Sequence, residues 1–211
     1  MSKRSRSSHR WLSRQRRDPF ARRAAAEGQG SRAHFKLLEL DRRFVLLRPG
    51  MSVLELGAAP GGWTRYLEER LDGGLVVACD PRPISAGADT VIIEAAFGEP
   101  EADRQLVEVL GDARVDLVLS DMAPNMSGNR TTDQARSMHL ADLALEAAGR
   151  WLKPDGALVV KLFQGEGMDA WMVELRRCFA TARLSKPEAS RSHSREVYAV
   201  AHGHRRMPDG A

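Results

Sequence analysis

The chain of 211 residues is poor in cysteine, in aromatic residues and in long apolar runs. Its two cysteines, Cys79 and Cys178, are far apart and form no C-x-x-C pair, so we expect reduced thiols, no structural metal and a cytoplasmic location. No run approaches the roughly 18 apolar residues that span a bilayer, and no apolar stretch resembles a secretion signal. The sequence therefore predicts one globular domain without a membrane segment.

Positive charge is concentrated at the N-terminus. Residues 1–23 hold nine of the 32 Lys and Arg residues but one of the 28 acidic residues, so the rest of the chain is mildly acidic. A basic segment favours a polyanionic partner, because each neutralised phosphate releases counterions. We predict a flexible RNA-binding arm over residues 1–29, with Trp11 and Phe20 as stacking residues, then a folded domain over 30–203 and a tail over 204–211. A solvated tail or an organellar transit peptide would have a similar composition.

From residue 31 onward, helical and strand patterns alternate. The expected strands are 51–56, 75–80, 90–93, 115–120, 157–161, 182–184 and 196–201, and the expected helices are 31–40, 63–71, 101–110, 132–152 and 168–179. This order predicts an α/β fold with a doubly wound, mostly parallel sheet that binds ligands at the carboxyl ends of its strands. A short polar link joins the last two strands, which predicts an antiparallel hairpin at one edge.

A glycine-rich loop follows the first strand within V-L-E-L-G-A-A-P-G-G-W, residues 53–63. Gly57, Gly61 and Gly62 are the candidates for a tight turn that presents backbone N–H groups to a ligand, although glycines here can also serve only the turn. Asp80 ends the second strand 23 positions after Gly57, close to the offset of about 20 at which a carboxylate meets ribose hydroxyls. The loop is neither G-x-G-x-x-G nor a P-loop. The pattern therefore favours a nucleoside over a dinucleotide or a triphosphate.

Glu55 lies inside the apolar first strand, two residues before the loop. A lone buried carboxylate is costly, so we expect it to face a cation or backbone donors of the loop. S-adenosylmethionine, a nucleoside with a sulfonium and an amino group, would supply both donors and positive charge. The alternative is that Glu55 is a structural cap on loop N–H groups.

Four further residues are expected to converge in this topology. Asp121 and Lys161 end the fourth and fifth strands, Lys36 lies on the helix leading into the domain, and Glu196 begins the last strand. Lys161 follows and precedes apolar residues, an unusual position for a solvated ammonium, so it requires a partner.

These segments resemble the bacterial FtsJ/RrmJ (RlmE) ribosomal RNA ribose 2′-O-methyltransferases. The resemblance extends from Arg10 to His202 and rests on L-E-L-G-A-A-P-G-G-W (54–63), S-D-M-A-P-N-M-S-G (120–128), V-V-K-L-F-Q-G-E-G (159–167) and S-R-E-V-Y (194–198). It implies a Rossmann-like class I methyltransferase dependent on S-adenosylmethionine, whose catalytic lysine–aspartate–lysine–glutamate tetrad corresponds to Lys36, Asp121, Lys161 and Glu196. It also implies cofactor contacts by Gly61, Trp63, Asp80 and Asp121.

The implied substrate is a uridine ribose in the A-loop of 23S rRNA, methylated within the 50S subunit to support its maturation. We expect a monomer. A 2′-O-methyltransferase for another RNA (a tRNA, an organellar rRNA or a cap) and a non-catalytic RNA-binding ribosome-assembly factor are the alternatives. Modification of the A-loop uridine distinguishes them.

One position departs from the family pattern. Members have G-D-F after the third strand, where the acid binds the adenine amino group, whereas this chain has Ala95-Ala96-Phe97. Ala96 has no side-chain acceptor, so Glu94, Glu99 or a backbone group would have to replace it. We expect a loss of about one hydrogen bond, ~1 kcal/mol, in cofactor affinity.

Lys161 is the candidate base. A ribose hydroxyl is a poor nucleophile, so the site must hold it in line with the S–CH₃ bond and assist removal of its proton. Lysine accepts a proton only where a dry site and nearby positive charge lower its pKa from about 10.4. The sequence leaves open whether Lys161 is a base or only positions the hydroxyl.

Overall fold

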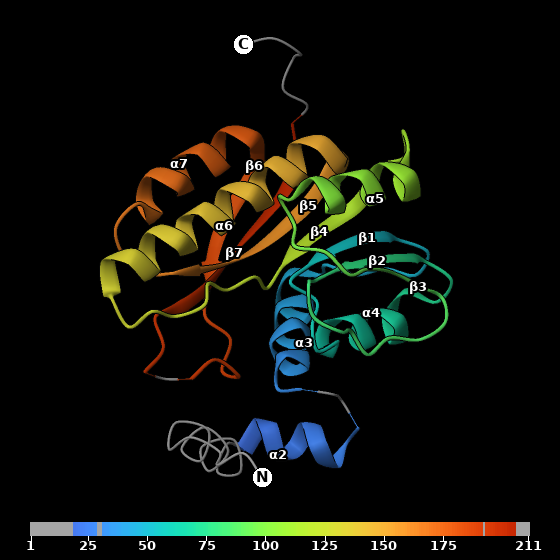
Figure 1. Ribbon diagram of the computed structural model, residues 1–211, viewed down its shortest axis with the longest axis horizontal. Coiled ribbons are helices and arrows are strands. Elements are labelled where there is room, and N and C mark those ends of the chain that lie inside the picture. The colour runs from blue at the N-terminus through green and yellow to red at the C-terminus, as the bar shows by residue number, and fades with distance from the viewer. Residues whose placement is uncertain (1–18, 29–30, 192, 206–211) are drawn as a thin grey trace.

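A computed structural model describes residues 19–28, 31–191 and 193–205, and it arranges them in three layers (Figure 1). A seven-stranded sheet lies between two layers of helices. The strands are β1 (Ser52–Leu56), β2 (Leu75–Cys79), β3 (Thr90–Ile93), β4 (Val115–Ser120), β5 (Leu152–Phe163), β6 (Phe179–Ser185) and β7 (Glu196–His204). The helices are α2 (Pro19–Ala26), α3 (Ala33–Phe44), α4 (Gly62–Leu71), α5 (Pro100–Leu110), α6 (Arg130–Trp151) and α7 (Met168–Cys178).

The sheet has the strand order β3-β2-β1-β4-β5-β7-β6. Strands β1 to β5 are parallel, and the chain runs outward from β1 through β2 to β3 on one side and from β4 to β5 on the other. The switch point between β1 and β4 is where such sheets bind ligands. The predicted doubly wound sheet with an antiparallel hairpin at one edge is confirmed. Within that hairpin, β7 is the strand that runs against the others, and it lies between β5 and the edge strand β6.

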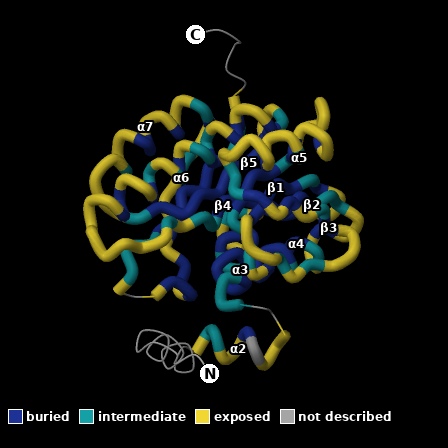
Figure 2. Tube along the Cα trace, viewed as in Figure 1, coloured by how far each residue is buried: buried dark blue, intermediate teal, exposed yellow. Residues whose placement is uncertain are grey.

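Each face of the sheet has its own apolar core, because successive side chains of a strand point to opposite faces. Leu54, Val118 and Val160 pack with α5, α6 and α7 on one face. Val53 and Leu119 pack with α3 and α4 on the other. Figure 2 shows the central strands buried between these helices. No helix in the described part of the chain is both long and apolar enough to cross a membrane.

The fifth strand is longer than its apolar run predicts. The predicted turn at residues 153–156 lies inside β5 as an irregular stretch, where the pairing with β4 shifts register. Lys153 Nζ donates to Asp116 Oδ1 at 2.8 Å, and Asp155 takes a left-handed φ of 62°. The ion pair with Asp116 of β4 thus holds residues 153–156 against the sheet, so the hydrogen-bonded pairing of β5 with β4 begins at Leu152.

The described end of the predicted arm is helical. Ala24 of α2 is buried, and the Phe20 ring lies 5.9 Å from the Phe35 ring of α3. Phe20 therefore packs on the domain, whereas Trp11 lies outside the described residues.

Two glycines shape the loop after β1. Gly57 has a φ of 77°, and a Cβ there would lie 2.8 Å from the backbone nitrogen of Met122. Gly61 has a φ of 105°, and a Cβ there would strike the carbonyl oxygen of Ser85. Both positions combine a left-handed backbone with close approach of a neighbouring loop, so only glycine fits without strain.

We predict that Gly57→Ala destabilises the fold more than a matched substitution at Gly73. Gly73 has a similar φ of 85°, and a Cβ at this position would meet nothing within 4 Å, so Gly73→Ala isolates the backbone cost of about 1–2 kcal/mol. Gly57→Ala adds the collision with Met122. Urea unfolding of both variants measures the difference, and equal losses in the free energy of unfolding would contradict the close approach.

Candidate active site

Six polar residues share the face of the sheet that α3 and α4 cover. The alternation of side chains along β1, β2, β4, β5 and β7 puts them on the same side as Val53, Val76, Leu119, Val159 and Val200. They are Glu55, Asp80, Asp121, Lys161, Glu196 and Tyr198. The strands thus bring together residues that lie up to 143 positions apart along the chain.

Lys161 and Asp121 form one ion pair at the ends of β5 and β4. The Lys161 side chain is 8% exposed, and its Nζ donates to Asp121 Oδ1 at 3.1 Å and to the Asp121 carbonyl oxygen. This contact supplies the partner that the apolar surroundings of Lys161 require.

Lys36 and Glu196 form a second ion pair, between α3 and the start of β7. Lys36 Nζ lies 2.7 Å from Glu196 Oε1, with side-chain exposures of 10% and 13%. Ser190 Oγ also donates to Glu196 Oε1 at 2.8 Å, which fixes the carboxylate.

The Tyr198 hydroxyl joins the two ion pairs. It donates to Asp121 Oδ1 at 2.6 Å and accepts from Lys36 Nζ at 3.3 Å. The four predicted tetrad residues therefore meet in one hydrogen-bonded network, and Tyr198 is a fifth member that the sequence patterns did not predict. Its position in the sequence could have indicated it, because a residue two positions after Glu196 in a strand points to the same face of the sheet.

The network sets the charge of its members. Burial alone would raise the pKa of Asp121, but Lys161, Lys36 and the Tyr198 hydroxyl together lower it below its ordinary value. Burial, with the charges of Asp121 and Glu196, raises the pKa of Tyr198 well above its ordinary value. Asp121 is therefore an anion and Tyr198 a neutral hydroxyl at physiological pH.

Two residues of α6 hold the loops that follow β4 and β5. Asp133 accepts from the Ser127 backbone N–H at 2.7 Å and from Gly128 at 3.2 Å. Gln134 Nε2 donates to the carbonyl oxygens of Phe163 and Glu166, both at 3.0 Å. Neither residue was predicted: Gln134 contacts a loop about 30 residues away and leaves no local pattern, whereas Asp133 contacts Gly128 and Ser127 only five and six residues before it, a local signal that could have indicated it.

The N–H groups of the glycine loop are largely used inside the protein. Gly57 and Ala58 both donate to the Cys79 carbonyl, at 2.9 and 3.3 Å, and Gly61 donates to the Ala58 carbonyl at 2.7 Å. Ala59 donates to Asp80 Oδ2 at 3.1 Å. The expectation that the loop presents backbone N–H groups to a ligand is therefore wrong for these four residues, and a loop whose donors are occupied does not cradle a phosphate.

Glu55 is buried, with 1% of its surface exposed. Its partner is Thr64 of α4, whose hydroxyl donates to Glu55 Oε2 at 2.7 Å, so the helix rather than the loop holds it. Burial raises the pKa of Glu55 to about 8; the bond from Thr64 opposes this shift, and the carboxylates of Asp121 and Asp80 add to it. Glu55 therefore carries a proton at neutral pH.

Trp63 and Gly62 begin α4 and pack against α3. The Trp63 indole is 1% exposed; it donates to the Ala33 carbonyl at 2.7 Å and lies 5.7 Å from the Tyr198 ring. The indole thus supports the helix that carries Lys36. Gly62 lies close to the Ser31 side chain, where a Cβ would collide with its hydroxyl.

Ala96 lies, partly exposed, on the loop after β3. Its carbonyl accepts from the Glu99 N–H at 3.1 Å, and the side chains of Glu94 and Glu99 are both exposed. The weaker cofactor grip expected at Ala96 stays a prediction.

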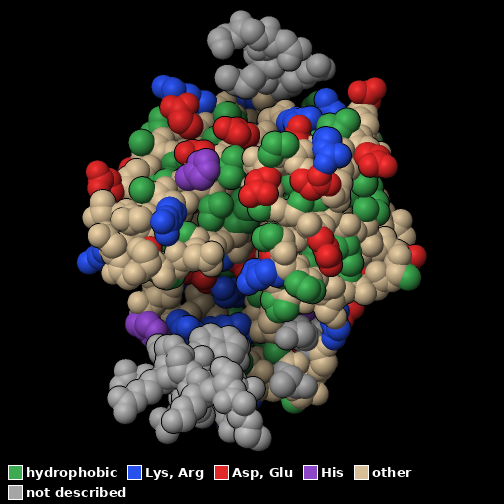
Figure 3. Space-filling model, viewed as in Figure 1, with side chains coloured by type: hydrophobic (Ala, Val, Ile, Leu, Met, Phe, Trp, Pro, Cys, Tyr) green, Lys and Arg blue, Asp and Glu red, His purple; other side chains and the backbone are tan. Residues whose placement is uncertain are grey.

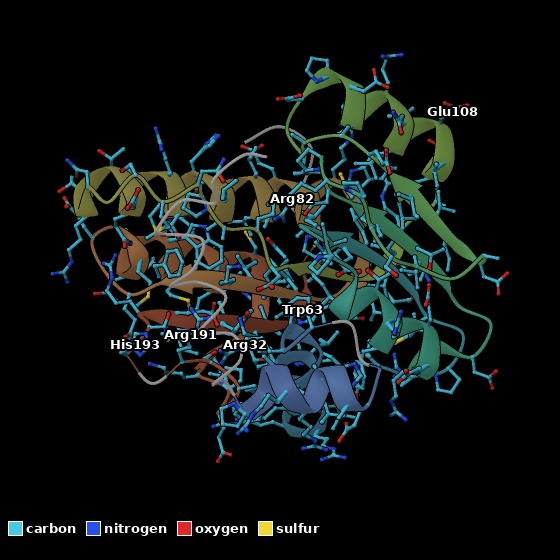
Figure 4. All side chains as sticks on the ribbon, turned by 60° about the horizontal axis from the view of Figure 1, so that its bottom comes forward. Arg32, Trp63, Arg82, Glu108, Arg191 and His193 are labelled. Atoms are coloured by element: carbon cyan, nitrogen blue, oxygen red, sulfur yellow. The ribbon has the colours of Figure 1, made fainter. Side chains whose placement is uncertain are left out.

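Basic residues line a pocket beside the network, here called the basic mouth. Arg32, Lys36, Arg191, Ser194 and Glu196 line a pocket of about 220 Å³. Figure 3 shows Lys and Arg side chains around a hollow in the lower half of the view. Figure 4 shows Arg32 and Arg191 close together beside α2. Arg195 instead donates to the Gln164 carbonyl at 3.1 Å and braces the loop after β5.

A doubly wound, mostly parallel sheet with an antiparallel β7 defines the fold class of this α/β protein, and its strand order is that of the class I methyltransferases. The comparisons with known proteins identify the family. The model of the FtsJ-like methyltransferase family matches residues 30–204, and the chain belongs to this family. It is therefore a methyltransferase.

Curated relatives cover nearly the whole chain. A Xanthomonas oryzae pv. oryzae protein named Ribosomal RNA large subunit methyltransferase E is 50% identical over 206 residues, which are 97% of this chain and 98% of the relative. An Alcanivorax borkumensis protein of the same name is 47% identical over 203 residues, 96% and 98% of the two chains. A Plasmodium falciparum crystal structure, described as a ribosomal RNA methyltransferase, matches with a TM-score of 0.75 and 25% identity, covering 83% of this chain and 98% of that one.

We predict that Glu55 makes the cofactor-free protein less stable as pH rises. Its folded pKa of about 8 lies above the ordinary value of 4.5, so its stabilising effect is complete below pH 4.5 and is lost as pH rises toward 8. Relative to Glu55→Gln, the wild type should lose up to about 1.4 kcal/mol of unfolding free energy per pH unit in that window. Urea unfolding between pH 5 and 9 measures this.

Every other side chain is the same in wild type and Glu55→Gln, so its contribution cancels in the comparison. Glu108→Gln, at an exposed position of α5 labelled in Figure 4, is the matched control and should keep the wild-type profile. Parallel profiles for wild type and Glu55→Gln would contradict the elevated pKa.

Proposed function

We propose that this protein transfers a methyl group from S-adenosylmethionine to the ribose 2′-hydroxyl of a uridine in the A-loop of 23S rRNA. The substrate is rRNA within the 50S subunit, in the cytoplasm, and the modification supports maturation of that subunit. The observation that carries the proposal is the network of Lys36, Asp121, Lys161, Glu196 and Tyr198 at the carboxyl ends of β4 and β5. The names of the relatives support an rRNA substrate.

The residues at the switch point fit the proposed cofactor. Asp80 would accept from the ribose hydroxyls, and the ionised Asp121 would face its positive groups; Glu55, protonated in the cofactor-free protein, would ionise opposite such a group. Gly57, Gly61 and Gly62 give the loop the tight turn that brings it to this edge, where each packs against a neighbouring segment. The occupied loop donors suit a ligand that has no phosphate. When bound, the cofactor supplies an electrophilic methyl on a positive sulfur, which becomes a neutral thioether.

Lys161 is the residue that contacts the substrate hydroxyl. A lysine ammonium has three N–H groups; Asp121 accepts two, through Oδ1 and its carbonyl, and the third is left for the 2′-oxygen. The proton released as the new O–C bond forms passes to the Asp121 carboxylate, the acceptor that lies beside Lys161 Nζ. Lys36, which is held by Glu196, and the Tyr198 hydroxyl keep Asp121 in place and ionised.

The basic mouth serves RNA binding. Arg32 and Arg191 stand beside Lys36, where phosphate contacts would position the target nucleotide without reading its base. Extrusion of that nucleotide from its loop would bring the 2′-hydroxyl to Lys161. The basic residues of 1–18 add sequence-independent affinity in this proposal.

Lys161→Ala should abolish methylation while cofactor binding survives, with a loss of at least about 10²-fold in rate. The decisive measurement is mass spectrometry of 23S rRNA from a strain that lacks the gene and is complemented with wild type or variant. The A-loop uridine should be 2′-O-methylated with wild type and unmodified with Lys161→Ala. An unmodified uridine after wild-type complementation would reject the substrate, and substantial turnover by the variant would reject the role of Lys161.

Tyr198→Phe should lower the methylation rate about tenfold, because Asp121 loses a charge-assisted hydrogen bond and the two ion pairs are uncoupled. Tyr66→Phe is the matched control. Tyr66 is also buried and donates to a carboxylate, Asp41 Oδ2, at 2.8 Å, but it lies outside the network. Both variants should lose stability, while the methylation rate of folded protein on 50S subunits should fall only for Tyr198→Phe. Equal rates in the two variants would show that Tyr198 is purely structural.

A further inference from the structure

Arg82, on the loop after β2, binds the carboxylate assigned above to the ribose of the cofactor. Its side chain is 69% exposed, whereas that of Asp80 is 3% exposed. Arg82 Nε lies 3.0 Å from Asp80 Oδ1, and Arg82 Nη2 lies 3.1 Å from Asp80 Oδ2. The guanidinium thus grips both carboxylate oxygens in a bidentate pair. Arg82 is labelled in Figure 4.

The acceptor capacity of Asp80 is filled in this arrangement. An ionised carboxylate has about four lone-pair sites, two on each oxygen. Oδ1 accepts from the Arg82 backbone N–H at 2.9 Å and from Nε, and Oδ2 accepts from the Ala59 N–H at 3.1 Å and from Nη2. The two backbone bonds shape the loops and are internal to the fold. The other two come from an exposed side chain that can rotate away.

We propose that the Arg82 guanidinium competes with the ribose hydroxyls of the nucleoside cofactor for Asp80, and that its displacement sets the cofactor affinity of this protein. The inference rests on the proposed function. Two hydroxyl donors replace the two guanidinium donors, so the number of hydrogen bonds to Asp80 is conserved. What is lost on binding is the ion pair of a largely exposed guanidinium with a buried carboxylate, and the ribose hydroxyls restore its two hydrogen bonds, so Arg82 lowers the affinity about two- to fivefold.

A structural role for Arg82 would have the opposite effect. Arg82 Nη2 also lies 3.5 Å from the Ala59 carbonyl, so the side chain connects the β2 loop to the glycine loop. If this connection organised the pocket, removal of the side chain would weaken binding. The sign of the change in affinity therefore separates competition from support.

The test is calorimetric titration of the full chain with S-adenosylhomocysteine. This ligand keeps the ribose but lacks the sulfonium, which limits the effect of removing a positive charge. Arg82→Ala should lower the Kd about two- to fivefold. Arg177→Ala is the matched control, because Arg177 is 67% exposed and pairs with Glu174 at 2.7 Å on α7, so it removes the same charge without touching Asp80. Its Kd should equal that of wild type.

A second comparison assigns the gain to Asp80. In a protein that already carries Asp80→Asn, Arg82→Ala should leave the Kd unchanged, because the amide does not hold the guanidinium as a carboxylate does. Arg82→Lys, which keeps the charge but loses the bidentate fork, should fall between wild type and Arg82→Ala, and it can be measured even where Asp80→Asn binds weakly.

An unchanged or higher Kd for Arg82→Ala, or a gain that persists with Asp80→Asn, would overturn the competition while leaving the proposed function intact. Failure of the wild type to bind either S-adenosylhomocysteine or S-adenosylmethionine would instead reject the proposed function, and this inference with it.

Discussion

The hydroxyl of Tyr198, held between Lys36 and Asp121, is the contact on which the candidate active site depends. It converts two separate ion pairs into one network in which every buried charge has a partner. Without such pairing, burying two lysines beside two carboxylates would be costly, because each charge leaves water. The same contacts keep Asp121 ionised against the effect of its burial. One set of hydrogen bonds and ion pairs therefore determines both the ionisation of Asp121 and the free-energy cost of burying the four charges.

This network exists because β7 runs against the other strands. In a parallel sheet the carboxyl ends of the strands meet at one edge, and a residue at the start of a strand lies at the opposite edge. Since β7 is antiparallel to β5, Tyr198 pairs with Lys161, and Glu196 pairs with Phe163 beyond it. The beginning of β7 thus lies beside the end of β5. Helix α3 then brings Lys36 over the same face, supported by the buried Trp63 indole.

Charge divides the edge of the sheet into two halves. Glu55 lies in β1, and Asp80 and Asp121 follow β2 and β4, while Lys36, Arg32 and Arg191 lie toward β5 and β7. The acidic half suits a ligand with hydroxyl and cationic groups, and the basic half suits a polyanion. Lys161 and Asp121 lie at the boundary, where a methyl group passing from one ligand to the other would have to cross. Arg82 is the exception, a cation set in the acidic half, where it occupies Asp80.

The sequence by itself determined the order of elements, the parallel sheet with its terminal hairpin, and the four charged residues of the network. These follow from local signals: apolar runs of strand length, glycines between strand and helix, and charges at strand ends. Only the tertiary structure decided the partners. Tyr198 has no chemical signature apart from its spacing to Glu196, Gln134 holds a loop about 30 residues away in the chain, and Arg82 reads as an ordinary surface arginine until its bonds to Asp80 are seen. The physical reason is that a pattern of residues fixes which face a side chain points to, whereas a hydrogen bond depends on which other chain segment reaches that face.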